Sequence, residues 1–186
     1  MRWLNQHPDD DKALIRQALR GKAKAQQAIY ERYSPKMMSV CLRYLGNEFD
    51  ANDVLVVAFT KVFDKLDTFR QEGSFEGWIR RIVVNEALGY LRKHRKNHHE
   101  EIEQADFEGM YTPPSEKLEA DDLHRLVRAL PDGYRSVFNL YAIEGYSHKE
   151  IAERLDISEN TSKSQLSRAR SLLKKKLAEL SEHEKI

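Results

Sequence analysis

Apolar residues recur at spacings of three and four through most of this 186-residue chain. Met37, Cys41, Tyr44 and Leu45 follow this spacing, and so do many later residues. Such a pattern places apolar side chains on one face of an α-helix. No segment alternates apolar and polar residues as a half-buried strand would. The sequence therefore predicts an all-α protein.

Turn-forming residues predict where these helices end. Breaks are expected at Ser34-Pro35, at Gly46-Asn47 and at residues 71–74, where Ser74 can cap the next helix. In the second half, the pattern stops at residues 131–133 and resumes up to Gly145.

One acidic segment interrupts the helical pattern from about residue 97 to residue 115. It combines many acids with Gly109 and Pro113-Pro114, and it cannot bury enough apolar surface to order itself. We expect a flexible acidic linker at residues 98–116 that joins two small helical domains, residues 1–97 and 117–186.

The near-neutral net charge of +1 hides a strong segregation of charge. Basic residues dominate residues 78–96 and 163–176, whereas acids dominate residues 100–122. The pattern predicts two basic faces and one acidic tract, so a polyanion is a candidate partner.

The stretch from Tyr146 to Leu177 has the order of a helix-turn-helix. Ser147 can cap a first helix, Asp156-Ile157 can form the turn, and Ser158 can cap a second helix. The basic runs alone would fit a solvated helical hairpin about as well as DNA binding, but this order of cap, short helix, turn, cap and basic second helix favours DNA binding. The candidate residues for reading a DNA major groove are Asn160, Thr161, Lys163, Ser164, Ser167, Arg168 and Arg170.

The same stretch, YSHKEIAERLDISENTSKSQLSRAR, with the preceding LPDGYRSVFNLYAIEG, resembles region four of bacterial sigma factors. The resemblance is to the small extracytoplasmic-function (ECF) class in particular. It implies that the second helix reads the minus-thirty-five promoter element. By itself the helix-turn-helix would also fit a response-regulator output domain, but residues 47–96 resemble sigma region two.

The resemblance to region two implies two further sets of residues. The first set would melt and read the minus-ten element, although Phe69 and Trp78 could equally be core residues: Phe69, Ser74, Phe75, Trp78, Arg80, Arg81 and Asn85. The second set would bind the clamp of RNA polymerase, with Val57 standing where the family often has an acid: Asp50, Asp53, Val54 and Val57.

The resemblance thus implies a non-catalytic sigma factor whose partners are core RNA polymerase and promoter DNA, both double-stranded and melted. The family is often held inactive by an anti-sigma protein, which would be a further partner. No cofactor is expected. No membrane insertion is expected either, because no window of the sequence is long and apolar enough to span a bilayer. We therefore expect a cytoplasmic location. We expect the acidic linker to thread polymerase channels or to cover the basic faces.

Two rival functions remain at this point. One is a self-sufficient helix-turn-helix repressor or activator whose N-terminal helices only dimerise. The other is a helical enzyme or metal protein that uses His94, His98 and His99, although no cysteine or firmly placed carboxylate completes a ligand set. The lone Cys41 lies in an apolar helical setting and is expected to be a buried hydrophobe.

Overall fold

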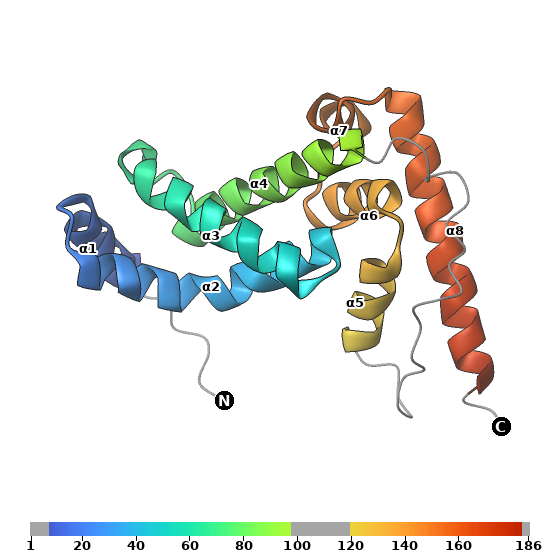
Figure 1. The fold of residues 1–186 in the computed structure, drawn as a ribbon, viewed down its shortest axis with the longest axis horizontal. Coiled ribbons are helices and arrows are strands. Elements are labelled where there is room, and N and C mark those ends of the chain that lie inside the picture. Colours follow the sequence, from blue (N-terminus) through green and yellow to red (C-terminus); the bar gives the residue numbers. More distant parts are fainter. Residues whose placement is uncertain (1–7, 98–119, 184–186) are drawn as a thin grey trace. The chain divides into compact units, whose positions relative to one another are not determined.

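The computed structural model describes residues 8–97 and 120–183, and all regular secondary structure in these ranges is helical (Figure 1). The fold is therefore all-α, as predicted. Contacts between Cα atoms divide the chain into two compact units. The first unit takes its described residues from Met1–Cys41 and Glu48–Ala87, and the second takes them from Leu42–Asn47 and Leu88–Ile186. This division cuts through two helices, whereas the predicted linker at 98–116 lies outside the described residues.

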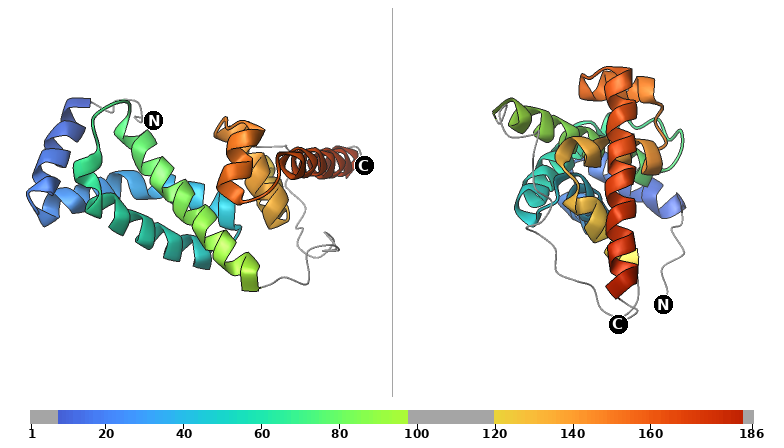
Figure 2. Two further views of the ribbon diagram at one scale, coloured as in Figure 1. Left: turned by 90° about the horizontal axis from the view of Figure 1, so that it is seen from above. Right: turned by 90° about the vertical axis from the view of Figure 1, so that its right-hand side faces the viewer.

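The first unit is built from α1 (Pro8–Leu19), most of α2 (Ala23–Leu45), α3 (Glu48–Asp64), the short 3-10 helix η1 (Leu66–Thr68) and the start of α4 (Phe75–Asn97). Helices α2, α3 and α4 lie side by side (Figures 1 and 2). Tyr33 of α2 packs edge-on against Phe75 of α4, with 5.5 Å between ring centroids. Lys61 of α3 forms an ion pair of 2.6 Å with Glu86 of α4.

The break predicted at Ser34-Pro35 is wrong, because α2 continues through Pro35. A proline inside a helix removes one backbone hydrogen bond and costs about 3 kcal/mol. The carbonyl that loses its donor belongs to Glu31, and both Glu31 and Pro35 are exposed, so water can reach it. Buried side chains on both sides of the proline, Tyr33, Met37 and Cys41, hold the helix against the core.

The second unit contains α5 (Ala120–Ala129), α6 (Asp132–Phe138), a π-helical turn η2 (Asn139–Ile143), α7 (His148–Leu155) and α8 (Glu159–His183). Figure 2 shows α8 as a long rod. Leu126 of α5 and Leu130, just after that helix, are buried against Ala169 and Leu173 of α8. One side of α8 is thereby fixed toward the core, and the opposite side is left to solvent.

A buried arginine organises the helix ends in the second unit. Arg135 is only 5% exposed, and its guanidinium donates to the backbone oxygens of Tyr44 (2.8 Å), Arg128 (2.7 Å) and Leu130 (2.9 Å). Burial lowers the pKa of Arg135, while the partner carboxylate Asp132 opposes that shift. These carbonyls end α2 and α5, where a cation is favoured by the helix dipole. The sequence analysis assigned Arg135 no role.

Gly46 lies beside this arginine in a left-handed backbone conformation, with φ at +82°. A Cβ atom added there would lie 3.0 Å from Nη1 of Arg135. The predicted helix end at Gly46-Asn47 is confirmed, because the turn needs a residue without a side chain.

Candidate nucleic-acid interface

The predicted helix-turn-helix is confirmed in α7 and α8. Ser147 caps α7 with a complete capping box: its hydroxyl accepts from the Glu150 amide, and the Glu150 carboxylate accepts from the Ser147 amide. Asp156 makes the turn with φ at +55°, a conformation that Asp tolerates better than most residues. Ser158 caps α8 by accepting from the Thr161 amide at 2.9 Å.

The predicted groove-reading residues fall mostly on one face of α8. Since successive residues turn by about 100° around a helix, positions 160, 163, 164, 167 and 168 share a face, opposite the buried Ala169. These five residues are exposed, namely Asn160, Lys163, Ser164, Ser167 and Arg168. Thr161 is half-buried, and its hydroxyl lies 2.8 Å from that of Ser158.

The same face continues further than the sequence analysis recognised. Ser171, Lys174 and Lys175 are exposed and follow the face by helical spacing. Projecting the 3.6-residue period onward from Arg168 would have identified them. The arrangement is a polar, basic stripe along a helix of 25 residues.

Two residues of this stripe carry interactions of their own. Lys163 pairs with Glu159 one turn earlier, at 2.7 Å, and its hydrogen bond lowers the pKa of that carboxyl group. Arg168 donates from Nη1 to the hydroxyl of Tyr134 at 3.4 Å. Both cations are therefore held at the surface of the second unit by neighbouring side chains.

In the first unit, three predicted residues form an aromatic cluster. Phe69 lies 5.1 Å from Phe75 and 5.4 Å from Trp78, measured between ring centroids, and Phe75 stacks on Trp78 at 5.8 Å. Phe75 is buried, whereas Phe69 and Trp78 are half-buried. The cluster thus serves the core, while Phe69 and Trp78 remain partly accessible to solvent.

The loop before α4 has the strained backbone of a tight turn. Gln71 has φ at +59° and Gly73 has φ at +92°. Ser74 caps α4 as predicted, because its hydroxyl accepts from the Gly77 amide at 3.0 Å. A residue other than glycine rarely adopts a positive φ. The conformation of Gln71 is therefore held by the residues that surround the loop.

Four predicted residues form a stripe along α4. Ser74, Trp78, Arg81 and Asn85 are spaced by four, three and four residues, so they share one face. Arg81 and Asn85 are exposed on it. Arg80 lies about 100° away around the helix from Arg81 and is half-buried. The sequence analysis grouped the two arginines, and the fold separates them.

A cavity of about 340 Å³ opens between α1 and this loop. Three residues of α1 line one side, Asp11, Lys12 and Ile15. The other side is lined by Phe69, Gln71, Gly73, Ser74, Phe75 and Glu76. Asp11 is fixed there, because Arg32 donates to it at 2.8 Å and the Tyr33 hydroxyl donates to it at 2.6 Å. Burial and this hydrogen bond to Asp11 raise the pKa of Tyr33. The sequence analysis gave α1 no part in a site.

The outer face of α3 is unusually apolar for a solvated surface. Phe49 is 77% exposed and Val56 is 61% exposed, with Val57 and the acid Asp53 beside them. Asp50 is half-buried. Val54 is only 3% exposed, so the fold places this predicted polymerase-binding residue in the core. Phe49 and Val56 are the residues of this face that the sequence analysis missed.

The described residues contain no group of three or more His, Cys, Asp and Glu side chains that could hold a metal ion. His94 stacks on Tyr90 with 4.0 Å between ring centroids, and His98 and His99 lie outside the described residues. Among the described helices, none is long and apolar enough to cross a membrane.

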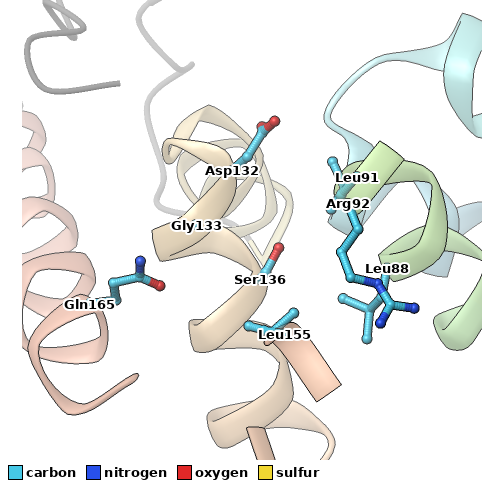
Figure 3. Close-up of a pocket in the computed structure, with 8 residues that line it drawn as sticks. All are labelled: Leu88, Leu91, Arg92, Asp132, Gly133, Ser136, Leu155 and Gln165. Carbon is cyan, nitrogen blue, oxygen red and sulfur yellow. The ribbon is translucent and has the colours of Figure 1, made fainter. Parts of the chain in front are cut away.

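A second hollow, in the second unit, is too small for a cofactor. Its volume is about 30 Å³, which is room for about one water molecule. Figure 3 shows the side chains around it, which come from α4, α6, α7 and α8: Leu88, Leu91, Arg92, Asp132, Gly133, Ser136, Leu155 and Gln165.

The helix-turn-helix and the aromatic helical unit together define a DNA-binding protein of the sigma-70 type. The family profile described as Sigma-70 region 2 matches residues 29–97, and that described as Sigma-70, region 4 matches residues 120–173. The chain belongs to the ECF class of RNA polymerase sigma factors, and it is a sigma factor without catalytic activity of its own.

Named relatives support this assignment over nearly the whole length. The chain is 31% identical over 184 residues to the ECF RNA polymerase sigma-E factor of Haemophilus influenzae, covering 91% of this chain and 96% of that protein. It is 31% identical over 182 residues to SigW of Bacillus subtilis, covering 91% and 97% respectively. The sigma-E factor of Escherichia coli is 30% identical over 183 residues, with 91% and 95% covered.

A solved structure agrees at the level of the fold. The sigma factor RpoE of Bartonella quintana, in complex with the anti-sigma factor NepR, has a TM-score of 0.51 and 20% identity to this chain. The match covers 82% of this chain and 96% of that chain.

Proposed function

We propose that this sigma factor directs RNA polymerase to a two-part promoter, with α8 reading the upstream element as duplex. The observation that carries this proposal is the exposed polar stripe of α8, which lies opposite the buried Ala169 and Leu173. A helix fits the major groove, where Asn, Arg and Lys side chains distinguish base pairs and contact phosphates.

The downstream element would be captured as a single strand by the first unit. Trp78 and Phe69 offer ring surfaces to unstacked bases, and each such stack contributes on the order of 1–3 kcal/mol. Arg81 lies on the same stripe and would hold a phosphate. The cavity beside Gln71 and Ser74 is large enough to receive an extruded base.

Core polymerase would dock on the outer face of α3, through Phe49, Asp53, Val56 and Val57. Apolar side chains this exposed, with charges beside them, are typical of a protein interface. Asp50 would contribute from the edge of this face. Val54 would act only by supporting the helix from inside.

Transcription reconstituted in vitro tests this proposal. The purified chain plus core polymerase should start transcription at defined sites on bacterial genomic templates, and mapping those starts would give both promoter elements. A repressor or activator that works alone would bind duplex without polymerase and would start no transcript with it. That result would refute the proposal.

Variants separate the two DNA contacts. Lys163→Ala and Arg168→Ala should weaken binding of the upstream duplex by polymerase, whereas Arg81→Ala should leave the closed complex intact and impair strand opening. Permanganate footprinting reports opening, and gel shifts on closed complexes report duplex binding. Equal loss of both complexes in all three variants would contradict the division of labour.

An anti-sigma protein is a further proposed partner, and we propose the cytoplasm as the place of action because the polymerase works there. The Bartonella quintana relative was solved with such a protein. An anti-sigma protein for this chain should compete with core polymerase in a binding assay. An excess of it that leaves binding of core polymerase unchanged would count against this role.

A further inference from the structure

The side chain of Tyr141 contacts both helices of the helix-turn-helix. Tyr141 belongs to η2 and is 37% exposed. Its ring stacks on the imidazole of His148, at the start of α7, with 4.7 Å between centroids and 24° between planes. The guanidinium of Arg170, on α8, lies 5.5 Å from the centre of the same ring.

One partner of this ring, His148, is itself held by the surrounding fold. Nδ1 of His148 lies 2.9 Å from the hydroxyl of Ser162, which is fully buried in α8. The imidazole therefore has a fixed orientation, and the Tyr141 ring lies against it. A cation is attracted to the face of an aromatic ring, so the Tyr141 ring favours one of the many orientations that a free arginine side chain would adopt.

Arg170 occupies the edge of the α8 stripe. By helical angle it lies next to Lys163 and about 60° from Ser167, on the side nearer Glu159. A side chain at the edge of a groove-reading helix faces the phosphate backbone beside the groove and does not face the base edges inside it.

From this geometry we propose that Tyr141 positions Arg170 to bind one backbone phosphate of the upstream duplex, with His148 supporting the ring. The proposal rests on the proposed function, because it takes α8 as the helix in the groove. Tyr141 is a positioning residue here, and the charge is supplied by Arg170. The expected interaction raises the affinity of the protein for duplex DNA of any sequence and does not change its preference for the promoter sequence.

Salt dependence of promoter binding tests the proposal, with polymerase carrying the full chain and a promoter mapped as above. Removing one phosphate interaction lowers the slope of log affinity against log salt by about 0.9, so the variant should lose about threefold to fourfold less affinity than the wild type between 50 and 200 mM salt. Arg170→Gln and Tyr141→Leu should both do this, and the double variant should equal Arg170→Gln alone. The ratio of specific to non-specific affinity should stay unchanged in all of them.

Three controls keep the outcome interpretable. Tyr141→Phe keeps the ring and should bind as the wild type does. Arg125→Gln removes an exposed charge from α5, which packs on the opposite side of α8 from the stripe, and should leave the slope unchanged. Thermal unfolding should match the wild type for each variant. If Tyr141→Leu proves unstable, Arg170→Lys tests the positioning role instead. This variant keeps the charge but loses the planar guanidinium that lies over the ring, so it should bind the promoter more weakly than the wild type.

Several results would overturn the proposal. A wild-type slope in Tyr141→Leu, or full affinity in Arg170→Lys, would mean that the ring does not position the cation. A loss in Arg170→Gln confined to the specific sequence would mean that Arg170 reads a base. If the wild-type polymerase complex itself shows no preference for the upstream element, the proposed function fails before this inference is reached.

Discussion

Replacing Phe49 with serine should weaken docking on core polymerase without weakening the fold. The side chain is 77% exposed in the free chain, so it contributes little to stability. Fully burying a phenylalanine is worth about 1.5–3 kcal/mol relative to full exposure, so covering its exposed part should contribute about 1–2 kcal/mol to docking. Since 1.4 kcal/mol is a factor of ten, the dissociation constant should rise roughly 5- to 30-fold.

The neighbouring Val54 provides a matched control in the same helix. It is 3% exposed, so Val54→Ala should lower the free energy of unfolding by on the order of 2 kcal/mol and leave docking of the folded chain unchanged. Titrating labelled protein with core polymerase measures docking, and urea unfolding measures stability. If Phe49→Ser binds polymerase as tightly as the wild type, or if it loses as much stability as Val54→Ala, the assignment of this face is wrong.

Three further outcomes follow from the structure. Arg81→Ala should impair strand opening more than Arg80→Ala does, because only Arg81 lies on the exposed stripe of α4. Permanganate reactivity of the minus-ten region measures strand opening. Equal effects of the two variants would refute the role of this stripe in opening. Burial raises the pKa of the Cys41 thiol to about 12, so a thiol reagent should label the protein only as fast as it unfolds, and rapid labelling of native protein would contradict this. Hydrogen bonds from the Ser147 amide and hydroxyl lower the pKa of Glu150 below its ordinary value of 4.5. The ionised carboxylate therefore contributes to stability at neutral pH, and this contribution is lost as the pH falls through the lowered pKa. Glu150→Gln should therefore lower the urea midpoint at neutral pH but not well below pH 4.5, and a difference that persists in acid would exclude this cause.

Local signals were enough to predict much of this fold. The caps at Ser74, Ser147 and Ser158 were all predicted, because a capping hydroxyl bonds to an amide only two or three residues away. The break at Pro35 was predicted from an equally local rule and is wrong. Packing of Tyr33 and Met37 against the core outweighs the missing hydrogen bond there.

The candidate sites were predictable as segments but not as surfaces. Helix geometry predicts that Arg80 and Arg81 point about 100° apart, and Val54 and Val56 about 200° apart, but the sequence could not tell which member of each pair faces solvent. Which of them faces solvent depends on the helices packed alongside. The exposure of Val56 and the burial of Val54 therefore appear only once α3 is placed in its unit.

By itself, the sequence determined most of the helices and the turn between α7 and α8, because these depend on residues within a few turns of one another. It also determined membership of the sigma family, because two such segments occur in order along the chain. Only the tertiary structure decided that Asp11 of α1 lines the cavity beside Phe75, that Arg135 reaches the carbonyl of Tyr44, and that Tyr141 lies against Arg170. Each of these pairs joins residues at least 29 positions apart in the chain. No local pattern encodes such a distance, because the packing of whole helices brings the two residues together.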